Sequence, residues 1–350
     1  MKKFKKLFFC TGGTGGHVFP AISLYENFND SNHQIIFLTD KRCEYILKEN
    51  GIDYKIINFT TFNKKIFLWP ISFFKIIKSI FECVRLFLME KPDTVVGFGS
   101  YVSFPGLISA KLLKIPTIIH EQNAVMGKSN RILSKIVDYI ALSYKNTKFC
   151  KINKKVFYTG MPIRSIFYKK KIKRNRYKKQ ILIIGGSQGA KVFSTLIPNI
   201  FKKLDRRLKE KIFICQQTQI NQKKNLQNIY KDLNIEFKLE SFFKDIYDEM
   251  HNADLIISRC GSSSLAEIET FSTPAFLFPL PHSKNNHQYE NAKRFSEKNE
   301  CVIFDETNLN ESKFIKELKK KIINKASKKL YKKNSKNLKL KDLVLRTLST

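Results

Sequence analysis

Two series of short apolar runs, each alternating with helix-like stretches, are the feature that most restricts the fold of this chain. The first series reads KLFFC, HQIIFLT, YKIINF, DTVVGFG, PTIIHE, YIALS and KVFYTG. The second follows the charge run KKKIKRNRYKK and reads QILIIGG, KIFICQQ, EFKLESF, DLIISRC and PAFLFPL. Apolar, β-rich runs separated by helices of about 10–20 residues indicate parallel sheets covered by helices on both faces. We therefore predict an α/β protein with two parallel sheets.

The length of the chain also favours two domains. Its 350 residues exceed the roughly 250–300 residues that a single hydrophobic core usually reaches. We predict a first domain over residues 1–158, a second over 159–325 and a basic helical tail over 326–350.

The composition is strongly basic. Lys and Arg number 64 against 30 Asp and Glu, which gives a formal net charge of +34. Such a charge favours polyanions, anionic membranes and phosphorylated ligands. An AT-rich genome would also enrich Lys together with Asn, Ile and Phe, so the charge alone assigns no function. The seven cysteines form no CxxC pair, which indicates a reducing compartment and argues against a disulfide framework or a zinc knuckle.

One long apolar stretch, IFLWPISFFKIIKSIFECVRLFLM over residues 66–89, raises the question of a membrane. A spanning helix needs about 20 mostly uncharged residues, and Lys75, Lys78, Glu82 and Arg85 interrupt this one along a single helical face. The segment is either a helix packed on its own domain or a surface helix that dips into a bilayer beside basic residues. Both interpretations can hold for the same helix.

The first glycine-rich loop, TGGTGGHVFP over residues 11–20, follows an apolar run. It fails the dinucleotide fingerprint G-x-G-x-x-G, because from Gly13 and Gly15 the third glycine would fall at Val18. We expect a helix that begins near Val18, with Pro20 in its first turn. His17 would then lie where the strands end, either as a general base or as a cap of the loop.

Two glycine turns of the second half offer anion and hydroxyl chemistry, each with a structural alternative. GGSQGA (185–190) places Ser187 at a predicted helix start, which is either an anion site or a tight turn that needs glycine for packing. In SRCGSSSLAEIE (258–269), Ser264 and Glu267 read either as a capping box or as a carboxylate for the hydroxyls of a ribose. Gln288 follows in NNHQYENA and can bind sugar hydroxyls.

Taken in order, TGGTGGHVFP, YVS, IPTIIHEQNAVMG, TGMPIR, IGGSQGA, SRCGSSSLAE and HQYENA resemble the MurG family, from about residue 7 to about residue 295. The resemblance implies a GT-B glycosyltransferase, in which two Rossmann-like domains face an interdomain cleft. The N-terminal domain would take the lipid acceptor and associate with the membrane, and the C-terminal domain would take the UDP-sugar.

The resemblance also implies a reaction and a location. The reaction is inverting transfer of N-acetylglucosamine from UDP to the C4 hydroxyl of N-acetylmuramic acid in lipid I, which gives lipid II for peptidoglycan, cell shape and cell division. No DxD motif stands at a strand end of the second half to demand a metal, and no cofactor is expected. The expected partners are UDP-N-acetylglucosamine, lipid I, anionic inner-membrane lipids and other cell-wall synthesis proteins, without nucleic acid. The enzyme would be peripheral on the cytoplasmic face of the inner membrane.

Individual residues follow from the same resemblance. His17 matches the proposed base, and Thr14 to Gly16 match positions that hold the sugar. Ser187 matches a phosphate contact, and Phe243 falls where an aliphatic residue usually meets uracil through its backbone. The positions that match the UDP-N-acetylglucosamine site of the family are Thr14, Gly15, Gly16, Asn123, Arg164, Ser187, Phe243, Ser262, Ser263, Ser264, Leu265, Ala266, Glu267 and Gln288.

Two departures and two alternatives complete the predictions. Ser100 and Phe104 stand where the family usually has glycines, and we expect their side chains near the acceptor diphosphate. One alternative is a related transferase of the same fold that acts on another lipid. The other is a basic nucleic-acid-binding protein, which would show clustered Arg, Lys and aromatic residues and no affinity for UDP.

Overall fold

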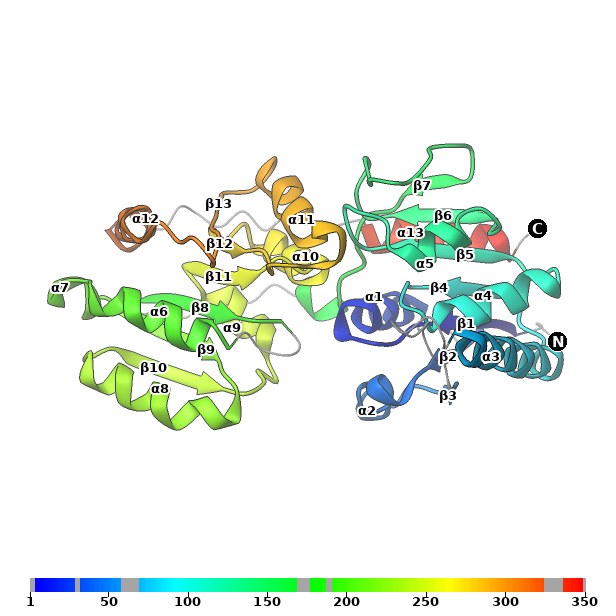
Figure 1. The fold of residues 1–350 in the computed structure, drawn as a ribbon, viewed down its shortest axis with the longest axis horizontal. Helices are drawn as coiled ribbons and strands as arrows, with labels where there is room; N and C mark the ends of the chain where they lie inside the picture. Colours follow the sequence, from blue (N-terminus) through cyan, green and yellow to red (C-terminus); the bar gives the residue numbers. More distant parts are fainter. Residues whose placement is uncertain are drawn as a thin grey trace. The chain divides into compact units, whose positions relative to one another are not determined.

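The computed structural model describes residues 4–28, 32–57, 69–168, 177–186, 191–323 and 336–348. The chain divides into two compact units, Met1–Ser165 with Ser335–Thr350, and Ile166–Asn334 (Figure 1). The predicted division differs at both ends. The first unit continues beyond residue 158, and the last helix belongs to the first unit instead of forming a separate tail.

Parallel strands form a seven-stranded sheet in the first unit, in the order β3-β2-β1-β4-β5-β6-β7. These strands are β1 (Lys5–Cys10), β2 (His33–Thr39), β3 (Tyr54–Ile56), β4 (Thr94–Gly97), β5 (Thr117–Glu121), β6 (Tyr139–Leu142) and β7 (Val156–Tyr158). The helical elements are α1 (Gly15–Tyr25), η1 (Glu26–Phe28), α2 (Lys41–Glu49), α3 (Trp69–Glu90), α4 (Ser103–Leu112), α5 (Lys128–Leu133) and α13 (Lys336–Thr347).

Helices cover both faces of this sheet because side chains alternate along each strand. Leu7 and Phe9 of β1 join a core cluster with residues of α1, α2 and α13. Phe8 and Cys10 of the same strand join a second cluster with residues of α3, α4 and α5. The first unit is therefore a doubly wound, Rossmann-like sheet, as the sequence predicts.

The second unit repeats this design with six parallel strands in the order β10-β9-β8-β11-β12-β13. Its strands are β8 (Lys179–Ile184), β9 (Ile212–Gln217), β10 (Glu236–Glu240), β11 (Leu255–Arg259), β12 (Ala275–Phe278) and β13 (Cys301–Ile303). Its helical elements are α6 (Phe193–Lys202), α7 (Arg206–Lys209), α8 (Ile220–Asp232), α9 (Ile246–Asn252), α10 (Ser262–Phe271), η4 (Lys284–Asn286), α11 (His287–Ser296) and α12 (Glu311–Ile323), and η3 (Ser165–Tyr168) joins the units. The sequence does not predict β13, which has three half-buried residues.

In both sheets the strand order reverses at one point, and this point predicts where ligands bind. Strand β1 lies between β2 and β4, and β8 lies between β9 and β11. In each sheet the chain therefore adds strands first on one side of the initial strand and then on the other side. In open α/β sheets, ligands bind outside the carboxyl ends of the strands at such a switch point.

Helix α3 packs on its own domain, as one of the two interpretations predicts, and its contact with a bilayer stays a prediction. It packs through a narrow face of mainly small residues, in which Ser79 and Cys83 are buried and Ser109 of α4 donates a hydrogen bond of 2.9 Å to Ile80 O. Phe74 and Phe81 are 71% and 70% exposed and face outward, whereas Phe87 near the end of the helix is buried against Phe8. Among the described residues, no helix is both long and apolar enough to cross a bilayer.

We expect the approach of α4 to the sheet to depend on Gly106. A Cβ atom at this position would lie 2.6 Å from Cys10 Sγ and 3.0 Å from Leu38 Cδ2. Gly106→Ala should therefore lower the free energy of unfolding by about 1–3 kcal/mol through overpacking, measured by urea denaturation. Gly127→Ala is the matched control, because its Cβ would meet only Glu121 Oε2, at 3.8 Å. Equal stability of the two variants would contradict this account.

Candidate functional site

Three loops of the first unit meet at the carboxyl ends of β1, β4 and β5. Phe98 N, just after β4, donates a hydrogen bond of 2.9 Å to Cys10 O at the end of β1. Ser103 Oγ lies 2.7 Å from the same carbonyl oxygen and donates to it. The glycine loop after β1 is thereby joined to the GFGSYVS segment after β4.

The glycine loop passes into α1 earlier than the sequence predicts. The helix begins at Gly15 with Thr14 as its N-cap, so the expected start near Val18 is wrong. Pro20 accordingly lies inside the helix and not in its first turn. Thr14 O accepts hydrogen bonds from His17 N and Val18 N, at 3.0 and 3.3 Å. Thr14, Gly15, Gly16 and His17 thus form a helix N-terminus, where the dipole and the first N–H groups favour anions and oxygen ligands.

His17 is half-buried and its ring is held from one side. Its Nδ1 atom lies 2.9 Å from Phe98 O and 3.1 Å from Gln122 Oε1. Both neighbours are oxygen acceptors, so Nδ1 carries the hydrogen and donates it. In a neutral imidazole the lone pair is then on Nε2, the nitrogen that can accept a proton. This geometry favours the interpretation as a base over that of a loop cap.

The HEQN segment after β5 forms a turn around a buried carboxylate, Glu121, which was not among the predicted site residues. Glu121 is 2% exposed, and its Oε1 accepts hydrogen bonds from Asn123 N at 3.0 Å and Asn123 Nδ2 at 3.2 Å. Its Oε2 accepts from Gly127 N at 3.0 Å and Asn130 Nδ2 at 2.8 Å. The half-buried Asn123 is therefore positioned by Glu121. The signal in the sequence is a charged residue at the end of an apolar strand.

Asp40 and Ser100 complete the surroundings of the glycine loop. Asp40, the N-cap of α2, accepts from Arg42 N at 3.1 Å and, over a long contact of 3.5 Å, from Gly13 N. Ser100 adopts φ = 63°, in the left-handed region that favours glycine, and its Oγ would lie 2.9 Å from a Cβ atom at Gly13. Its side chain therefore lies beside the glycine loop, and its expected place near the acceptor diphosphate stays a prediction.

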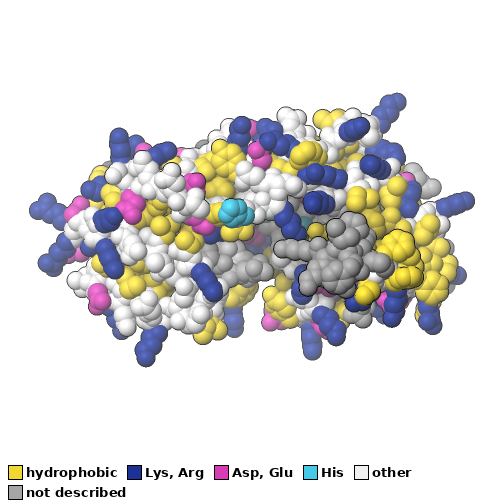
Figure 2. Space-filling model, in the orientation of Figure 1, with side chains coloured by type: hydrophobic (Ala, Val, Ile, Leu, Met, Phe, Trp, Pro, Cys, Tyr) yellow, Lys and Arg dark blue, Asp and Glu magenta, His cyan; other side chains and the backbone are white. Residues whose placement is uncertain are grey.

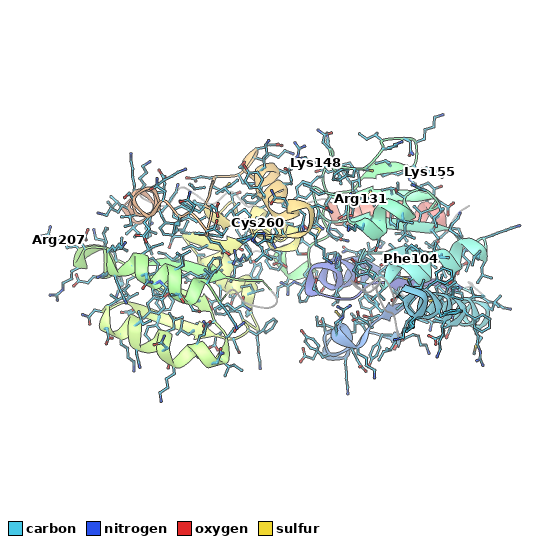
Figure 3. All side chains as sticks on the ribbon, in the orientation of Figure 1. Phe104, Arg131, Lys148, Lys155, Arg207 and Cys260 are labelled. Carbon is cyan, nitrogen blue, oxygen red and sulfur yellow. The ribbon has the colours of Figure 1, made fainter. Side chains whose placement is uncertain are left out.

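Phe104 and Arg164 take different positions. Phe104 of α4 is half-buried and packs against the core cluster around Phe8 and Cys10 (Figure 3), and its expected place near the acceptor diphosphate stays a prediction. Arg164 is half-buried, and its guanidinium carbon lies 5.1 Å from the centre of the Phe19 ring of α1.

In the second unit, a buried glutamine joins the carboxyl ends of three strands. Gln217 Oε1, at the end of β9, accepts a hydrogen bond of 3.2 Å from Gly185 N after β8. Its Nε2 donates at 3.3 Å to Ser241 O after β10. Gly186 follows with φ = 82°, and a Cβ atom at this position would meet nothing within 4 Å, which leaves space beside the backbone. Ser187 lies outside the described residues.

The segment after β11 forms the start of α10. The helix begins at Ser262 with Gly261 as its N-cap, so Ser264 is the third helical residue and the capping box of Ser264 and Glu267 is wrong. The backbone of Gly261 is extended, and glycine has no side chain that could cap the helix. Ser263, Ser264 and Glu267 are half-buried, Ser262 is buried, and Leu265 and Ala266 are buried core residues that can offer a ligand only backbone atoms.

Helix α11 holds this segment through two side chains. Gln288 Oε1 accepts hydrogen bonds from Cys260 N at 3.2 Å and Leu280 N at 2.9 Å. Asn291 Nδ2, fully buried, donates at 3.1 Å to Cys260 O. Cys260 lies between β11 and α10 (Figure 3). Because the oxygen of Gln288 faces these amides, its Nε2 is the end that can donate to a sugar hydroxyl.

Two further residues lie at this edge. The Phe243 side chain is 6% exposed, so a ligand could meet this residue only through its backbone. Arg259 ends β11, is 9% exposed, and pairs with Glu306 at 2.5 Å. Its guanidinium carbon lies 5.0 Å from the centre of the Phe193 ring, at the first residue of α6. Arg259 thus holds the helix that follows the GGSQGA loop, a role that its buried position after an apolar strand could have indicated.

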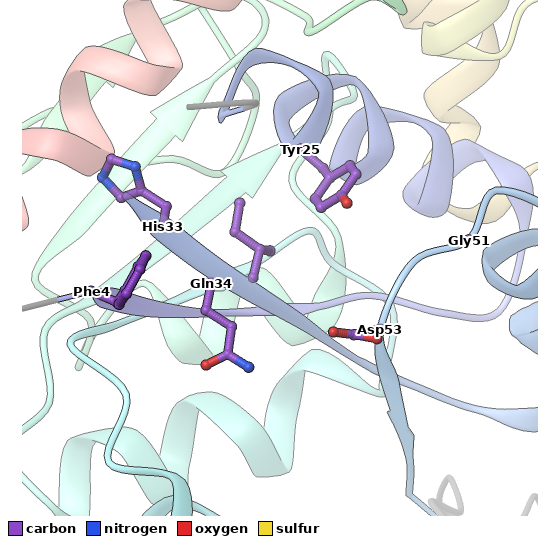
Figure 4. Close-up of a pocket in the computed structure, with 7 residues that line it drawn as sticks. Phe4, Tyr25, His33, Gln34, Gly51 and Asp53 are labelled. Carbon is purple, nitrogen blue, oxygen red and sulfur yellow. The ribbon is translucent and has the colours of Figure 1, made fainter. Parts of the chain in front are cut away.

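Two other kinds of site, a metal cluster and a surface pocket, can be compared with these loops. The described parts of the chain contain no group of three His, Cys, Asp or Glu residues that could hold a metal ion. A pocket of about 460 Å³ in the first unit is lined by Phe4, Tyr25, His33, Gln34, Ile35, Gly51 and Asp53 (Figure 4). These residues surround the amino ends of β1, β2 and β3, the edge opposite to the glycine loops.

Comparisons with known proteins agree with this geometry. Residues 7–142 match the glycosyltransferase family 28 N-terminal domain, and residues 180–346 match the glycosyltransferase family 28 C-terminal domain. A protein of Rickettsia bellii (strain RML369-C) is 37% identical over 298 residues, which cover 83% of each chain. It is named UDP-N-acetylglucosamine–N-acetylmuramyl-(pentapeptide) pyrophosphoryl-undecaprenol N-acetylglucosamine transferase. A protein of Pelagibacter ubique (strain HTCC1062) with the same name is 34% identical and covers 91% of this chain and 89% of its own.

Solved structures extend the similarity to the full chain. The crystal structure of Acinetobacter baumannii MurG superposes with a TM-score of 0.73 at 28% identity, covering 99% of this chain and 95% of that one. A UDP-GlcNAc 2-epimerase from Neisseria meningitidis superposes with a TM-score of 0.66 at 14% identity, covering 98% and 99%, and shows a shared fold alone.

Proposed function

Because the chain belongs to the MurG family of glycosyltransferase family 28, we propose that it transfers N-acetylglucosamine from UDP-N-acetylglucosamine to the C4 hydroxyl of N-acetylmuramic acid in lipid I. The product is lipid II, the precursor of peptidoglycan, and through it the enzyme serves cell shape and division. The observation that carries the mechanism is His17, whose Nδ1 faces two acceptor oxygens and whose Nε2 bears the lone pair. The family assignment also decides against a nucleic-acid-binding protein.

The chemistry follows from that tautomer. Nε2 of His17 takes the proton of the C4 hydroxyl as its oxygen attacks C1 of the donor sugar. The bond from C1 to the diphosphate oxygen breaks, its electron pair leaves with UDP, and attack from the opposite face inverts the anomeric centre. A positioned general base of this kind contributes typically 10²–10⁴-fold to the rate.

The second unit binds the donor in this proposal. Glu267 takes the ribose hydroxyls, and Ser262, Ser263 and Ser264 in the first turn of α10 offer N–H groups to phosphate. Leu265 and Ala266 belong to the same segment around ribose and phosphate, but Leu265 N already donates to Gly261 O within the helix. Gln288 donates from Nε2 to the sugar, and Phe243 meets the uracil through its backbone. Ser187 and Arg164 stabilise the charge of the departing diphosphate, and Thr14, Gly15, Gly16 and Asn123 hold the transferred sugar.

Donor binding tests this assignment without the lipid acceptor. Glu267→Ala should weaken UDP-N-acetylglucosamine by roughly 10–100-fold, because a hydrogen bond to a charged group contributes about 1.5–3 kcal/mol. Glu269→Ala, on the same helix, is the matched control and should bind as the wild type. Calorimetric titration with UDP-N-acetylglucosamine and with UDP-glucose measures both variants. Unchanged affinity in Glu267→Ala would remove this residue from the donor site.

A peripheral place on an anionic membrane completes the proposal. Phe73, Phe74, Ile77, Phe81 and Leu88 are exposed along α3, and Figure 2 shows hydrophobic side chains gathered over this helix with Lys and Arg beside them. The exposed basic residues of the helix are Lys75, Lys78 and Arg85. An apolar stripe beside basic residues is typical of helices that lie in a membrane interface. The acceptor of the proposed reaction is anchored in such a membrane.

Vesicle binding tests the role of α3. The double variant Phe74→Asp/Phe81→Asp should lower affinity for anionic vesicles by at least about 100-fold, because each buried phenylalanine contributes about 1.5–3 kcal/mol. Ile220→Asp/Ile323→Asp in the second unit, where both side chains are also exposed, is the control and should bind normally. Vesicle flotation at two salt concentrations is the measurement. Equal binding by both double variants would exclude α3 as the contact.

A further inference from the structure

A buried chain of hydrogen bonds leads from His17 into the interior of the first unit through Gln122. We propose that Gln122 is a positioning residue whose side-chain amide holds His17 in the tautomer with hydrogen on Nδ1, leaving Nε2 to act as the base. This inference rests on the proposed function of His17. Gln122 is 1% exposed, so its contribution is through His17 and not through contact with a substrate.

The orientation of the Gln122 amide follows from its neighbours. Its Nε2 lies 2.9 Å from Phe98 O and 3.0 Å from His120 O, and both carbonyl oxygens require a donor. The flipped amide would place its own oxygen against these two oxygens. The nitrogen therefore faces the carbonyls, and Oε1 faces His17 Nδ1 at 3.1 Å as an acceptor.

His120 reinforces this orientation from the other side. Its Nε2 lies 3.1 Å from Gly160 O and donates to that carbonyl oxygen, so its Nδ1 is the acceptor of a neutral ring. Gln122 Nε2 lies 3.1 Å from this Nδ1. Burial lowers the pKa of His120 to about 4, and the ring is neutral at physiological pH. A series of buried hydrogen bonds thus connects Gly160 O to His17 through His120 and Gln122.

These contacts determine which nitrogen of His17 can act as the base. Phe98 O and Gln122 Oε1 both accept from Nδ1, and Phe98 O also accepts from Gln122 Nε2. Turning the ring over or moving the hydrogen to Nε2 would therefore remove the donor that His17 supplies to the buried Gln122 Oε1. Together, Phe98 O and Gln122 Oε1 restrict the orientation of the His17 ring more than a single acceptor would. Orienting a histidine through its second nitrogen is a general way to prepare a base.

The tautomer itself is the first measurement, and it needs no substrate. Nitrogen-15 NMR of protein labelled in its histidine rings, with His17→Ala to assign the signal, should show hydrogen on Nδ1 and a lone pair on Nε2 for His17. Hydrogen on Nε2 in the wild type would overturn the proposal. A wild type with this tautomer but without transferase activity would instead contradict the proposed function.

Gln122→Met is the second measurement, because methionine retains the volume and removes both polar groups. We expect kcat to fall by about 10-fold or more with KM for UDP-N-acetylglucosamine unchanged, and the His17 signal to become a mixture of tautomers. Ser143→Ala is the control, since it removes a contact of 3.3 Å to His120 Nε2 and a hydrogen bond of 3.4 Å to Met161 Sδ, neither of which involves Gln122, and it should leave tautomer and kcat unchanged. Wild-type kcat and an unmixed tautomer in folded Gln122→Met would overturn the proposal.

Discussion

His17→Ala is expected to lower kcat by roughly 100-fold or more while the Kd for UDP-N-acetylglucosamine stays within about 2-fold of the wild type. The physical reason is that alanine removes the nitrogen that would take the hydroxyl proton, whereas the proposed donor contacts of the second unit remain. Steady-state kinetics with a lipid I analogue, together with donor titration, measure the two quantities separately.

A second histidine of the same unit is the control for this prediction. His33 begins β2 at the edge of the sheet opposite to the glycine loops, where it lines the pocket of Figure 4. His33→Ala should retain kcat within about 2-fold, because no step of the proposed reaction takes place at that edge. Full activity in His17→Ala would remove this histidine from the mechanism, and equal losses in both variants would point to a general loss of structure.

The second large effect is expected at Gly99, which limits where the His17 ring can lie. A Cβ atom at Gly99 would stand 3.1 Å from His17 Nδ1, 3.2 Å from His17 Cε1 and 3.4 Å from Gln122 Oε1. Gly99 also adopts φ = 77°, a conformation that costs other residues about 1–2 kcal/mol. Gly99→Ala should therefore displace the ring and lower kcat by about 10-fold or more, with donor affinity retained.

Gly51 separates backbone strain from crowding in this experiment. It adopts φ = 63°, and a Cβ atom there would meet nothing within 4 Å. Gly51→Ala should lose a similar amount of stability, on the order of 1 kcal/mol, without losing activity. Both variants are compared by thermal unfolding and by steady-state kinetics. If Gly51→Ala lost as much kcat as Gly99→Ala, strain alone would explain the effect and the crowding argument would be wrong.

The fold could be predicted from the sequence because apolar runs report buried parallel strands directly. All seven predicted runs of the first unit and all five of the second are strands of the sheets. The missing strand β13 has three half-buried residues, as has the predicted strand β7, so its length and exposure do not explain why the sequence prediction omits it. The start of α1 was misplaced because glycines argue against a helix by propensity, whereas at a helix N-terminus they are compatible with its first turn.

The site was less predictable because its contacts join segments that are distant in the sequence. His17 and Gln122 meet only because the sheet order places β1, β4 and β5 side by side, and that order is a property of the whole unit. The roles of Glu121 and Gln217 likewise depend on backbone amides of other loops. The capping box of Ser264 and Glu267 is wrong for a local reason, since the N-cap of the helix is Gly261, three residues before Ser264.

The most direct test of the account is the product formed from UDP-N-acetylglucosamine and a lipid I analogue by the purified protein. We predict a single product in which N-acetylglucosamine is joined through a β linkage to the C4 oxygen of N-acetylmuramic acid, identified by mass spectrometry and NMR. Retention of the α configuration, or transfer to another lipid such as diacylglycerol while the lipid I analogue remains unmodified, would contradict the proposed function.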